Sequence, residues 1–492
     1  MAHKPSNSLP ECWVETKLEN VVDILDNMRK PVNNKERQSR IADKSESELF
    51  PYYGATGQAG FIDDFLFDEE LVALGEDGVP FFDGKKTKAY MLHGKTWVNN
   101  HAHVIRGGEF LPNKLLCYYL NQFDYHGYVN GGTRLKLTQA NMRKMPIFLA
   151  PLPEQKRIVE KLDSLLAQVD TIQQRLNNLP GIIKRFRQSV LAAAVSGKLT
   201  EQWRGENNVT TPNIEVFIKY WSKRYESLGL KFTNPKLNSK TEDIKSYPET
   251  WLNTQLGNVF DVYVGSTPSR KNSEYWAGEV PWVSSGEVAF CRISSTKEKI
   301  TELGLSNAST KLHPIGTVML AMIGQGKTRG QPAILDIEAA HNQNTAALRI
   351  PDSYCVSEYL YFYLSKQYEE TRMVGAGNNQ KALNKKSVQS LNFACPPKEE
   401  QTEIVRLVEQ YFALADTLEK NLANAKQRVD NLTQSILAKA FRGELVPQDP
   451  NDEPADKLLA RIKAARIEAE KLEKAAKISA RKATKTSKAK NK

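Results

Sequence analysis

A basic segment framed by glycines, GQGKTRG at residues 324–330, is the strongest candidate for phosphate chemistry in this chain. A Walker A loop would need a glycine five residues before Gly326, and that position is Ala321. Such a loop also leads into a helix, whereas Pro332 follows closely here. The pattern therefore disfavours ATP binding. It is typical of a basic loop that can approach a phosphate backbone or a base edge, and a plain surface turn is the alternative.

Other patterns that could carry chemistry fail on spacing or on a missing partner. Residues 54–60, GATGQAG, have the spacing GxxGxxG, whereas a dinucleotide fingerprint needs GxGxxG. His101 and His103 are two apart on an expected strand, and without a third ligand nearby a structural pair is favoured over a metal site. No Ser/His/Asp set, pair of catalytic carboxylates or NPPY-type tetrapeptide stands out. The sequence thus predicts no catalytic residue and no metal site.

Two long helices must position these loops. Residues 154–199 and 400–445 align without a gap, and 16 of the 46 paired positions are identical. In both copies apolar residues recur at alternating intervals of four and three, which is the seam of a coiled coil. A 46-residue helix is about 70 Å long, so each is expected to pack antiparallel against its twin. The predicted seam includes Ile158, Leu162, Leu165, Val169, Ile172 and Leu176 in the first copy, and Ile404, Val408, Tyr411, Leu418, Leu422 and Val429 in the second.

The duplication extends beyond the helices. LPECWVETKLENV near the N-terminus matches YPETWLNTQLGNV near the middle, which pairs Trp13 with Trp251. NNHAHVIR and NQNTAALR form a second matching pair, each just before a helical run rich in Tyr and Leu. Two similar units joined in one chain tend to pack with approximate two-fold symmetry. The predicted fold class is α+β: two similar mixed α/β domains separated by two long helices that form an antiparallel coiled coil.

The expected organisation has six parts. They are a first globular domain at 1–150, a helical region at 151–204, a linker with a short helix at 205–246, a second globular domain at 247–395, a second helical region at 396–446, and a charged helix with a basic tail at 447–492. Pro180 interrupts the first long helix, where a proline costs about 3 kcal/mol, so a kink or a break is expected there. The second helix has Lys426 at that position and is expected to run straighter. Residues 477–492 are expected to be disordered.

The composition is that of an ordinary soluble protein, with 40% hydrophobic and 25% charged residues in 492. Five cysteines without a CxxC pair suggest neither a disulfide framework nor a zinc site, and they fit a reducing cytoplasm. No membrane span or signal peptide is expected. The net charge of +11 is uneven, because residues 451–492 alone carry 13 Lys/Arg against 6 Asp/Glu. The body is therefore too weakly basic to predict nucleic-acid binding from charge, and the tail is either a solvated appendage or a contact for nucleic acid or a subunit.

Six segments along the chain look like parts of one known protein family. PLPEQKRIVEKLDSLLAQVD and KRFRQSVLAAAVSGKLTEQWR look like its central conserved region, and PPKEEQTEIVRLVEQYFALAD with SILAKAFRGEL looks like the distal one. YYGATGQAGFIDDFLFDE and GEVPWVSSGEV look like pieces of its target-recognition domains. Together they resemble the specificity (S) subunit of bacterial Type I restriction–modification enzymes, over nearly the whole chain.

The resemblance implies a non-catalytic DNA-recognition subunit. Each globular domain would read one half of an asymmetric, bipartite target in double-stranded DNA. The helices would set the separation of the halves and dock two methyltransferase (M) subunits for adenine-N6 methylation. Two restriction (R) subunits would add ATP-dependent restriction. S-adenosylmethionine would belong to the M subunits, and ATP and Mg²⁺ to the R subunits, with no cofactor bound by this chain.

The aromatic and basic side chains of the loops are the candidates for DNA contact. Two other classes of function stay open: a coiled-coil protein-interaction adapter without its own DNA readout, and a stand-alone nuclease or NTPase that uses the loop at 324–330. The candidate residues are Tyr52, Tyr53, Lys85, Lys86, Lys88, Arg134 and Lys136 in the first domain, and Arg270, Lys271, Lys327, Thr328, Arg329 and Lys381 in the second.

Overall fold

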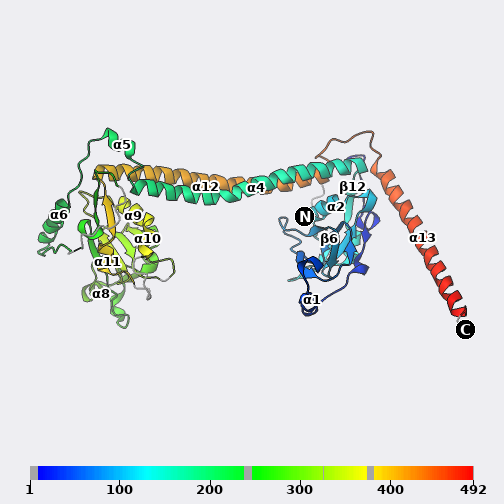
Figure 1. Cartoon of the computed structure of the whole chain (residues 1–492), viewed down its shortest axis with the longest axis horizontal. Coiled ribbons are helices and arrows are strands. Elements are labelled where there is room, and N and C mark those ends of the chain that lie inside the picture. The colour runs from blue at the N-terminus through cyan, green and yellow to red at the C-terminus, as the bar shows by residue number, and fades with distance from the viewer. Residues whose placement is uncertain (1–8, 236, 238–246, 325, 374–381, 491–492) are drawn as a thin grey trace. The chain divides into compact units, whose positions relative to one another are not determined.

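Two compact units, each built from two separate stretches of the chain, make up the protein. The computed structural model describes residues 9–235, 237, 247–324, 326–373 and 382–490. The first unit comprises residues 1–177 and 424–492, and the second comprises residues 178–423. Helices α4 (Leu152–Val195) and α12 (Lys398–Phe441) each contribute one half to each unit (Figure 1). Because each unit combines the start of one helix with the end of the other, the two helices run antiparallel, as predicted.

The first unit holds two four-stranded sheets, with strand orders β2-β9-β6-β7 and β4-β3-β8-β5, and two further strand pairs, β1-β12 and β10-β11. Its helices besides α4 and α12 are α1 (Asn34–Ile41), α2 (Asn113–Gln122), α3 (Gln139–Lys144) and α13 (Ala455–Lys490). Its strands are β1 (Val14–Lys17), β2 (Asp23–Ile24), β3 (Phe50–Gly54), β4 (Gly57–Ile62), β5 (Phe67–Asp68), β6 (Leu71–Gly75), β7 (Ala89–Leu92), β8 (Lys95–Val98), β9 (Ala102–Arg106), β10 (Val129–Asn130), β11 (Lys136–Leu137) and β12 (Pro146–Leu149).

The second unit holds sheets of order β14-β21-β18-β19-β16 and β17-β15-β20, and the pair β13-β22. Its helices are α5 (Glu201–Glu206), α6 (Ile214–Glu226), α7 (Leu256–Val259), α8 (Glu302–Asn307), α9 (Ser357–Lys366), α10 (Tyr368–Met373) and α11 (Lys385–Gln389). Its strands are β13 (Leu252–Gln255), β14 (Asp261–Val264), β15 (Trp276–Val283), β16 (Cys291–Ile293), β17 (Glu298–Ile300), β18 (Val318–Ala321), β19 (Pro332–Leu335), β20 (Ala340–His341), β21 (Thr345–Arg349) and β22 (Asn392–Cys395).

Most strands of the two units follow the same order and pairing. The antiparallel run β2-β9-β6-β7 has its counterpart in β14-β21-β18-β19. The run β4-β3-β8, with one antiparallel and one parallel pairing, matches β17-β15-β20. The pair β1-β12, next to the start of α4, matches β13-β22, next to the start of α12. The duplication predicted from short sequence matches therefore covers these strands, whereas β5 and the pair β10-β11 of the first unit and β16 of the second have no counterpart among the described strands.

Equivalent side chains make equivalent contacts at the entry to each unit. Asn20 donates from Nδ2 to Oγ1 of Thr16 over 3.0 Å, and Asn258 donates to Thr254 over the same distance. Both bonds stabilise the turn between the first strand of the unit and the strand that enters its main sheet. The two turns therefore hold the main sheets in the same way relative to β1 and β13.

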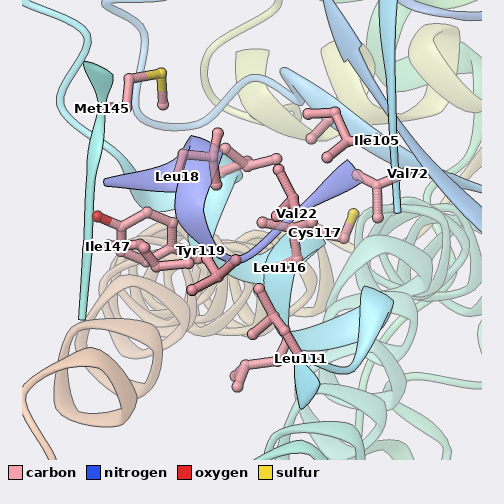
Figure 2. Close-up of a cluster of buried hydrophobic side chains, with 14 of the residues drawn as sticks. Leu18, Val22, Val72, Ile105, Leu111, Leu116, Cys117, Tyr119, Met145 and Ile147 are labelled. Atoms are coloured by element: carbon pink, nitrogen blue, oxygen red, sulfur yellow. The ribbon is translucent and has the colours of Figure 1, made fainter. Parts of the chain in front are cut away.

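Each unit has its own apolar core, to which the long helices contribute. In the first unit the inner face of α2, including Leu116 and Leu120, packs on the sheet, and Ile158 of α4 joins this core. Figure 2 shows part of it, with Leu18 and Tyr119 among the labelled side chains. In the second unit α9 takes the place of α2. The apolar positions of α2 recur at helical spacing, which is why one face of a short helix can be buried this completely.

The seam positions are buried to different extents along the helices. Ile158 and Leu162 of α4 are buried, as are Ile404 and Val408 of α12. Further along, Ile172, Leu179, Leu418 and Leu432 are exposed. Near its start each helix packs against a sheet as well as against its twin, whereas a pair of helices alone covers only one face of each. The middle of the helix pair therefore leaves apolar side chains accessible.

The structure differs from two local expectations. Helix α4 is a single helix from Leu152 to Val195 with Pro180 inside it, so of the expected kink or break the break is absent. One lost hydrogen bond is offset by packing on both sides, including that of buried Ile183. The tail expected to be disordered continues α13 to Lys490. Its alanine and lysine content favours helix, a preference that outweighed the disorder suggested by its charge.

Candidate nucleic-acid interface

The two basic loops singled out by sequence occupy the same place in the repeated fold. Residues 76–88 connect β6 to β7, and residues 322–331 connect β18 to β19. Since β6-β7 and β18-β19 are equivalent hairpins, the loops are equivalent tips. The first contains GKKTK at 84–88 and the second GKTRG at 326–330. We call them the first and the second tip loop. The two tip loops are therefore alike both in their basic residues and in their position in the fold.

Helix α10 holds the backbone of the second tip loop. Arg372 donates from Nη2 to the carbonyl oxygen of Gly326 over 2.7 Å, and the hydroxyl of Tyr368 donates to the carbonyl oxygen of Lys327. The chain then enters strand β19 and not a helix, so the loop lacks the helix N-terminus of a Walker A site. The Lys327 side chain is exposed and Thr328 is half-buried. Helix α10 thus holds the described residues 326–327 of the loop, which present the exposed side chain of Lys327.

Arg329 has a structural role that its sequence context did not predict. Its guanidinium is partly buried and donates from Nη2 to the carbonyl oxygen of Arg372 at the end of α10. Arg372 in turn contacts Gly326 at the start of the loop. The two arginines thus cross-link the second tip loop and α10. Arg329 would have to leave this contact to reach a base edge, so we do not include it among the DNA-contact residues proposed below.

In the first tip loop only two of the three lysines are accessible. Lys85 has a side chain that is 70% exposed, with Nζ 3.6 Å from Oδ2 of Asp430 on α12, and Lys86 is exposed beside it. Lys88 is only 2% exposed. Its Nζ donates to the carbonyl oxygen of Asp83 over 2.6 Å, and burial lowers its pKa. Lys88 thus holds the loop together from inside, so we do not include it among the DNA-contact residues proposed below.

The hairpin β10-β11 brings Arg134 and Lys136 to the base of the first tip loop. Arg134 donates from Nη2 to Oδ1 of Asp77 over 3.0 Å, and Nζ of Lys136 lies 3.2 Å from Oε1 of Glu76. Both cations are exposed. The turn that precedes them contains Gly131, whose φ is 109°. Arg134 and Lys136 thus form a second basic surface next to residues 76–77.

A buried charged network supports this hairpin from below. His103 places Nδ1 2.6 Å from Oδ2 of Asp26 and Nε2 2.9 Å from the carbonyl oxygen of Leu137. Each ring nitrogen of His103 therefore has an oxygen partner within hydrogen-bond distance. Burial alone would raise the pKa of Asp26, but hydrogen bonding to His103 and its charge outweigh this and lower it. Leu137 is the last residue of β11, so its hydrogen bond to His103 holds the hairpin that carries Arg134 and Lys136.

His101 and His103 do not form a joint site. His101 lies just before β9 and has Nδ1 3.0 Å from Oδ1 of Asp77, whereas His103 faces Asp26. Within the described ranges, no group of three or more His, Cys, Asp or Glu side chains is arranged to hold a metal ion. Each histidine instead pairs with a different carboxylate under the first tip loop, in keeping with the predicted structural role.

The aromatic candidates of the first unit are covered by their own surroundings. Tyr52 is buried, donates its hydroxyl to the carbonyl oxygen of Val32, and lies under the guanidinium of Arg37 at 5.2 Å. Tyr53 is half-buried and stacks on Tyr90 with ring centroids 5.5 Å apart. Such contacts are typical of a core edge. We therefore omit Tyr52 from the proposed contact set, while Tyr53 keeps one accessible edge.

In the second unit Arg270 lies flat on an aromatic surface. Its guanidinium is 3.7 Å from the ring centroid of Trp276 and donates from Nη2 to Oε2 of Glu298 over 2.8 Å. Stacking of this kind fixes an arginine with its donors aimed along the ring plane. Lys271 follows directly and is exposed. Lys381 lies outside the described residues.

Sequence reasoning missed Tyr368 and Arg372, which position the second tip loop. The only available signal was their spacing of four in a helical run, which indicates a shared face but not what that face holds. Their role depends on contacts between distant parts of the chain.

Comparison with known proteins gives a consistent result. The family model described as "Type I restriction modification DNA specificity domain" matches residues 10–180 and 248–426, one match in each repeat. The EcoBI specificity subunit of a Type I restriction enzyme from Escherichia coli is 30% identical over 93% of both chains. The EcoKI specificity subunit from Escherichia coli K12 is 32% identical over 74% of both chains.

Solved structures agree at the level of fold. The crystal structure of the HsdS subunit from Thermoanaerobacter tengcongensis has a TM-score of 0.55 at 18% identity and covers 90% of this chain and 99% of its own. A chain from a study of complex assembly and conformational transition of the Type I system has the same TM-score at 19% identity, over 89% of this chain. Among the described residues, no helix has the length and apolar content needed to cross a membrane.

Proposed function

Because this chain belongs to the family of Type I restriction–modification DNA specificity subunits, we propose that its two units read the two halves of one bipartite DNA target through their equivalent tip loops. The chain is the DNA specificity subunit, the non-catalytic part of a Type I restriction–modification complex. The single observation that carries the proposal is the repeated hairpin. The same strand pair, β6-β7 and β18-β19, ends in a basic, glycine-containing tip in both units.

By their chemistry, the exposed cations divide into proposed phosphate contacts and candidates for base readout. Lysine is a mobile point charge suited to phosphate, whereas arginine can bind a guanine edge through two parallel hydrogen bonds. Arg134 is exposed and tied only to Asp77 at its base. The proposed set is Lys85, Lys86, Arg134 and Lys136 in the first unit, and Arg270, Lys271, Lys327 and Thr328 in the second, with Tyr53 at the edge of the first. Because the two sets differ, the two half-sites should differ and the target should be asymmetric.

The duplication also bears on which DNA strand each unit would read. If the two repeats pack around an approximate two-fold axis, as expected from the sequence, they would present equivalent loops to opposite strands of a duplex. Helices α4 and α12 join the two units, so they would also set the gap between the halves. The gap length and the bases read depend on how side chains enter the groove.

Exposed apolar positions on the helices support docking of partner subunits. Ile172 of α4 and Leu418 of α12 occupy the same position of the duplicated sequence and are 41% and 45% exposed. Accessible apolar side chains at equivalent sites suit two copies of one partner. We assign them to two M subunits, which would supply S-adenosylmethionine chemistry at adenine. R subunits, where present, would supply ATP and Mg²⁺ chemistry for restriction. A DNA target in turn implies a cytoplasmic protein.

Mapping methylated adenines in a host with and without this gene tests the proposal. The expected result is one bipartite, asymmetric motif that is methylated only when the gene is present. Replacing residues 9–148 with the equivalent segment of a relative should change one half of that motif and leave the other. A swap that changed both halves would contradict separate readers. Assembly of the complex without any sequence-specific retention of DNA would favour a protein-interaction adapter.

A further inference from the structure

Each tip loop has an exposed phenylalanine beside it. Among the described residues three phenylalanines are exposed, namely Phe61 at 46%, Phe82 at 48% and Phe290 at 39%. Phe82 lies within the first tip loop, three residues before Lys85. The backbone N–H of Phe290 donates over 3.0 Å to the carbonyl oxygen of Pro332, the residue that follows the second tip loop. Two of the three exposed rings therefore lie at the tips, whereas Phe61 lies on β4.

The first tip loop presents Phe82 on a fixed backbone. The preceding residue, Phe81, is 2% exposed and packs on Tyr125 with ring centroids 4.8 Å apart. On the other side, Nζ of Lys88 donates to the carbonyl oxygen of the residue that follows Phe82. The Phe82 ring stacks on the imidazole of His126, with centroids 4.2 Å apart and an angle of 19° between the ring planes. Because its backbone and one face are already held, this ring loses little conformational freedom on binding.

Phe290 keeps a strained backbone conformation. Its φ is 55°, in the left-handed region that a bulky side chain disfavours, and among the described residues other than glycine only Ala277 shares a positive φ. The Phe290 ring packs on that of Tyr368 with centroids 5.0 Å apart, and the Tyr368 hydroxyl donates to the carbonyl oxygen of Lys327. Strain of this kind persists where the surrounding structure holds it, and it is concentrated at functional sites. The strained residue is thus joined to the second tip loop through Tyr368.

The two rings reach the tips from different segments of the repeated fold. Phe82 belongs to the loop between β6 and β7, whereas Phe290 directly precedes β16, which has no counterpart among the described strands of the first unit. They are therefore not two copies of one duplicated residue. Each nevertheless accompanies an exposed lysine of its tip loop, Lys85 or Lys327. The duplication alone does not account for a ring at both tips.

We propose that Phe82 and Phe290 are wedges, and that each inserts its ring between base pairs of the half-site read by its unit. This inference rests on the proposed function and adds a contact made through shape and stacking. Proteins insert phenylalanine between base steps in this way and partly unstack them. A protein partner would instead select for a core of apolar residues from which charged residues are depleted. Exposed lysines accompany both rings, and they favour a polyanion.

Fluorescent base analogues test the proposal in the assembled complex. The analogues 2-aminopurine and pyrrolocytosine are quenched by stacking, so their fluorescence rises where a base step opens. The duplex carries the methylated motif once that motif has been mapped, with one analogue at one position at a time. Methyltransferases extrude the base that they modify, so the methylated adenine itself is never replaced by an analogue. With the parent protein, the analogue next to one step in each half-site should brighten on binding.

Each alanine variant should affect only the half-site of its own unit. Phe82→Ala should abolish the fluorescence rise in the half-site read by the first unit and leave the rise in the other. Phe290→Ala should do the reverse. The affinity for DNA should fall about tenfold in either variant, because a stacked aromatic ring is lost. Phe82→Leu should keep most of the rise, since leucine also serves as a wedge.

Two control variants separate a wedge from a packing residue. Phe61→Ala removes a ring of similar exposure outside the tips, and it should leave the fluorescence and the affinity as in the parent. Phe290→Gly relieves the positive φ, so its unfolding midpoint should be no lower than that of the parent while its fluorescence rise is lost. A lower midpoint together with an unchanged fluorescence rise would make Phe290 a packing residue and overturn the proposal.

The remaining outcomes separate the wedges from the function on which they rest. A parent protein that methylates its motif but opens no base step would overturn the proposal and leave the proposed function intact. Alanine variants that both keep the fluorescence rise of the parent would overturn it as well. A variant that no longer assembles with its partner subunits would assign its ring to a protein contact. Loss of all sequence-specific methylation in the parent would instead contradict the proposed function.

Discussion

Gly443 ends helix α12 with a φ of 75°, and a side chain at this position would overlap the ring of Pro10. Gly197 ends α4 with a φ of 78° and packs in the same way against Pro248. Pro10 and Pro248 begin the two copies of the repeat. The end of α12, from the second copy, therefore contacts the start of the first copy, and the end of α4 contacts the start of the second. The units therefore share their helices, which explains why each unit consists of two separate stretches of the chain.

Replacing Gly197 or Gly443 by alanine should destabilise the fold by more than backbone strain alone. A positive φ costs an alanine roughly 1 kcal/mol, and overlap with a proline ring adds a further packing penalty. Gly229 is the matched control, because its φ is 68° but nothing lies near its Cβ position. Denaturant unfolding of the three alanine variants measures the difference. Equal losses at all three positions would show that the proline contacts do not matter.

Glu154 and Glu400 are equivalent buried carboxylates whose substitution should have opposite effects. Oε2 of Glu154 accepts from Nε1 of Trp13 over 3.1 Å, and burial raises its pKa. Glu400 instead pairs with Arg204. Glu154→Gln keeps an acceptor for Trp13 and removes a buried charge, so its stability should be unchanged or higher by up to about 1 kcal/mol.

Glu400→Gln should lower the free energy of unfolding by about 3 kcal/mol, because it leaves the Arg204 guanidinium partly buried without its carboxylate. Chemical denaturation at pH 7 followed by tryptophan fluorescence compares the two variants directly. Similar losses of unfolding free energy in the two variants would mean that the Arg204–Glu400 ion pair does not stabilise the protein as proposed.

Lys327→Ala should weaken DNA binding for every sequence by a similar factor. The side chain is exposed at the second tip loop, and a lysine–phosphate contact contributes about 0.9 to the salt slope. The methylated motif should not change. Lys219→Ala, at an exposed position on α6, is the control and should leave the slope as it is. If the two variants had the same slope, the loop would not contact DNA.

Ile172→Lys and Leu418→Lys should each weaken the docking of one partner subunit. Both positions are exposed, so the change should leave folding intact. The lysine would place a charge in an apolar contact, and the affinity for the partner should fall at least tenfold, or by about 1.4 kcal/mol. Native mass spectrometry of the assembled complex should detect species that lack one partner. Gln174→Lys, on the exposed surface of α4, is the control. Full assembly of both variants would place the docking surface elsewhere.

Acid should destabilise the second unit through two buried histidines. Burial lowers the pKa of His313 to about 2 and that of His341 to about 4. Nδ1 of His313 accepts a hydrogen bond from Nε of Arg349 over 3.0 Å, which requires the neutral ring. Both pKa values lie below that of an unfolded histidine, near 6.5, so this contribution to stability is complete above pH 6.5 and is lost as pH falls.

At pH 5 each histidine should cost about 2 kcal/mol relative to pH 7.5. Urea unfolding at the two pH values measures the loss, and His341→Gln should reduce the pH dependence by about one proton. A midpoint that stayed constant between pH 7.5 and pH 5 would contradict the assignment of two neutral buried rings.

Local periodicity was sufficient to predict the parts of this fold that depend on it. The intervals of four and three fixed both long helices and their antiparallel pairing, because a continuous apolar stripe on so long a helix needs another helix to cover it. The match between Trp13 and Trp251 predicted the duplication. Pro180 was the exception, since the penalty for one proline is local and packing along the rest of the helix exceeds it.

Only the tertiary structure decided which charged residues are available for binding. Lys86 and Lys88 are two apart in one loop, yet one is exposed and the other is buried beneath it. Arg329 is anchored by α10, whose position no local pattern specifies. Trp221 of α6 and Ile462 of α13 are both buried, and the sequence around neither residue specifies the surface that covers it. Exposure depends on contacts between distant segments, and neither composition nor spacing encodes those contacts directly.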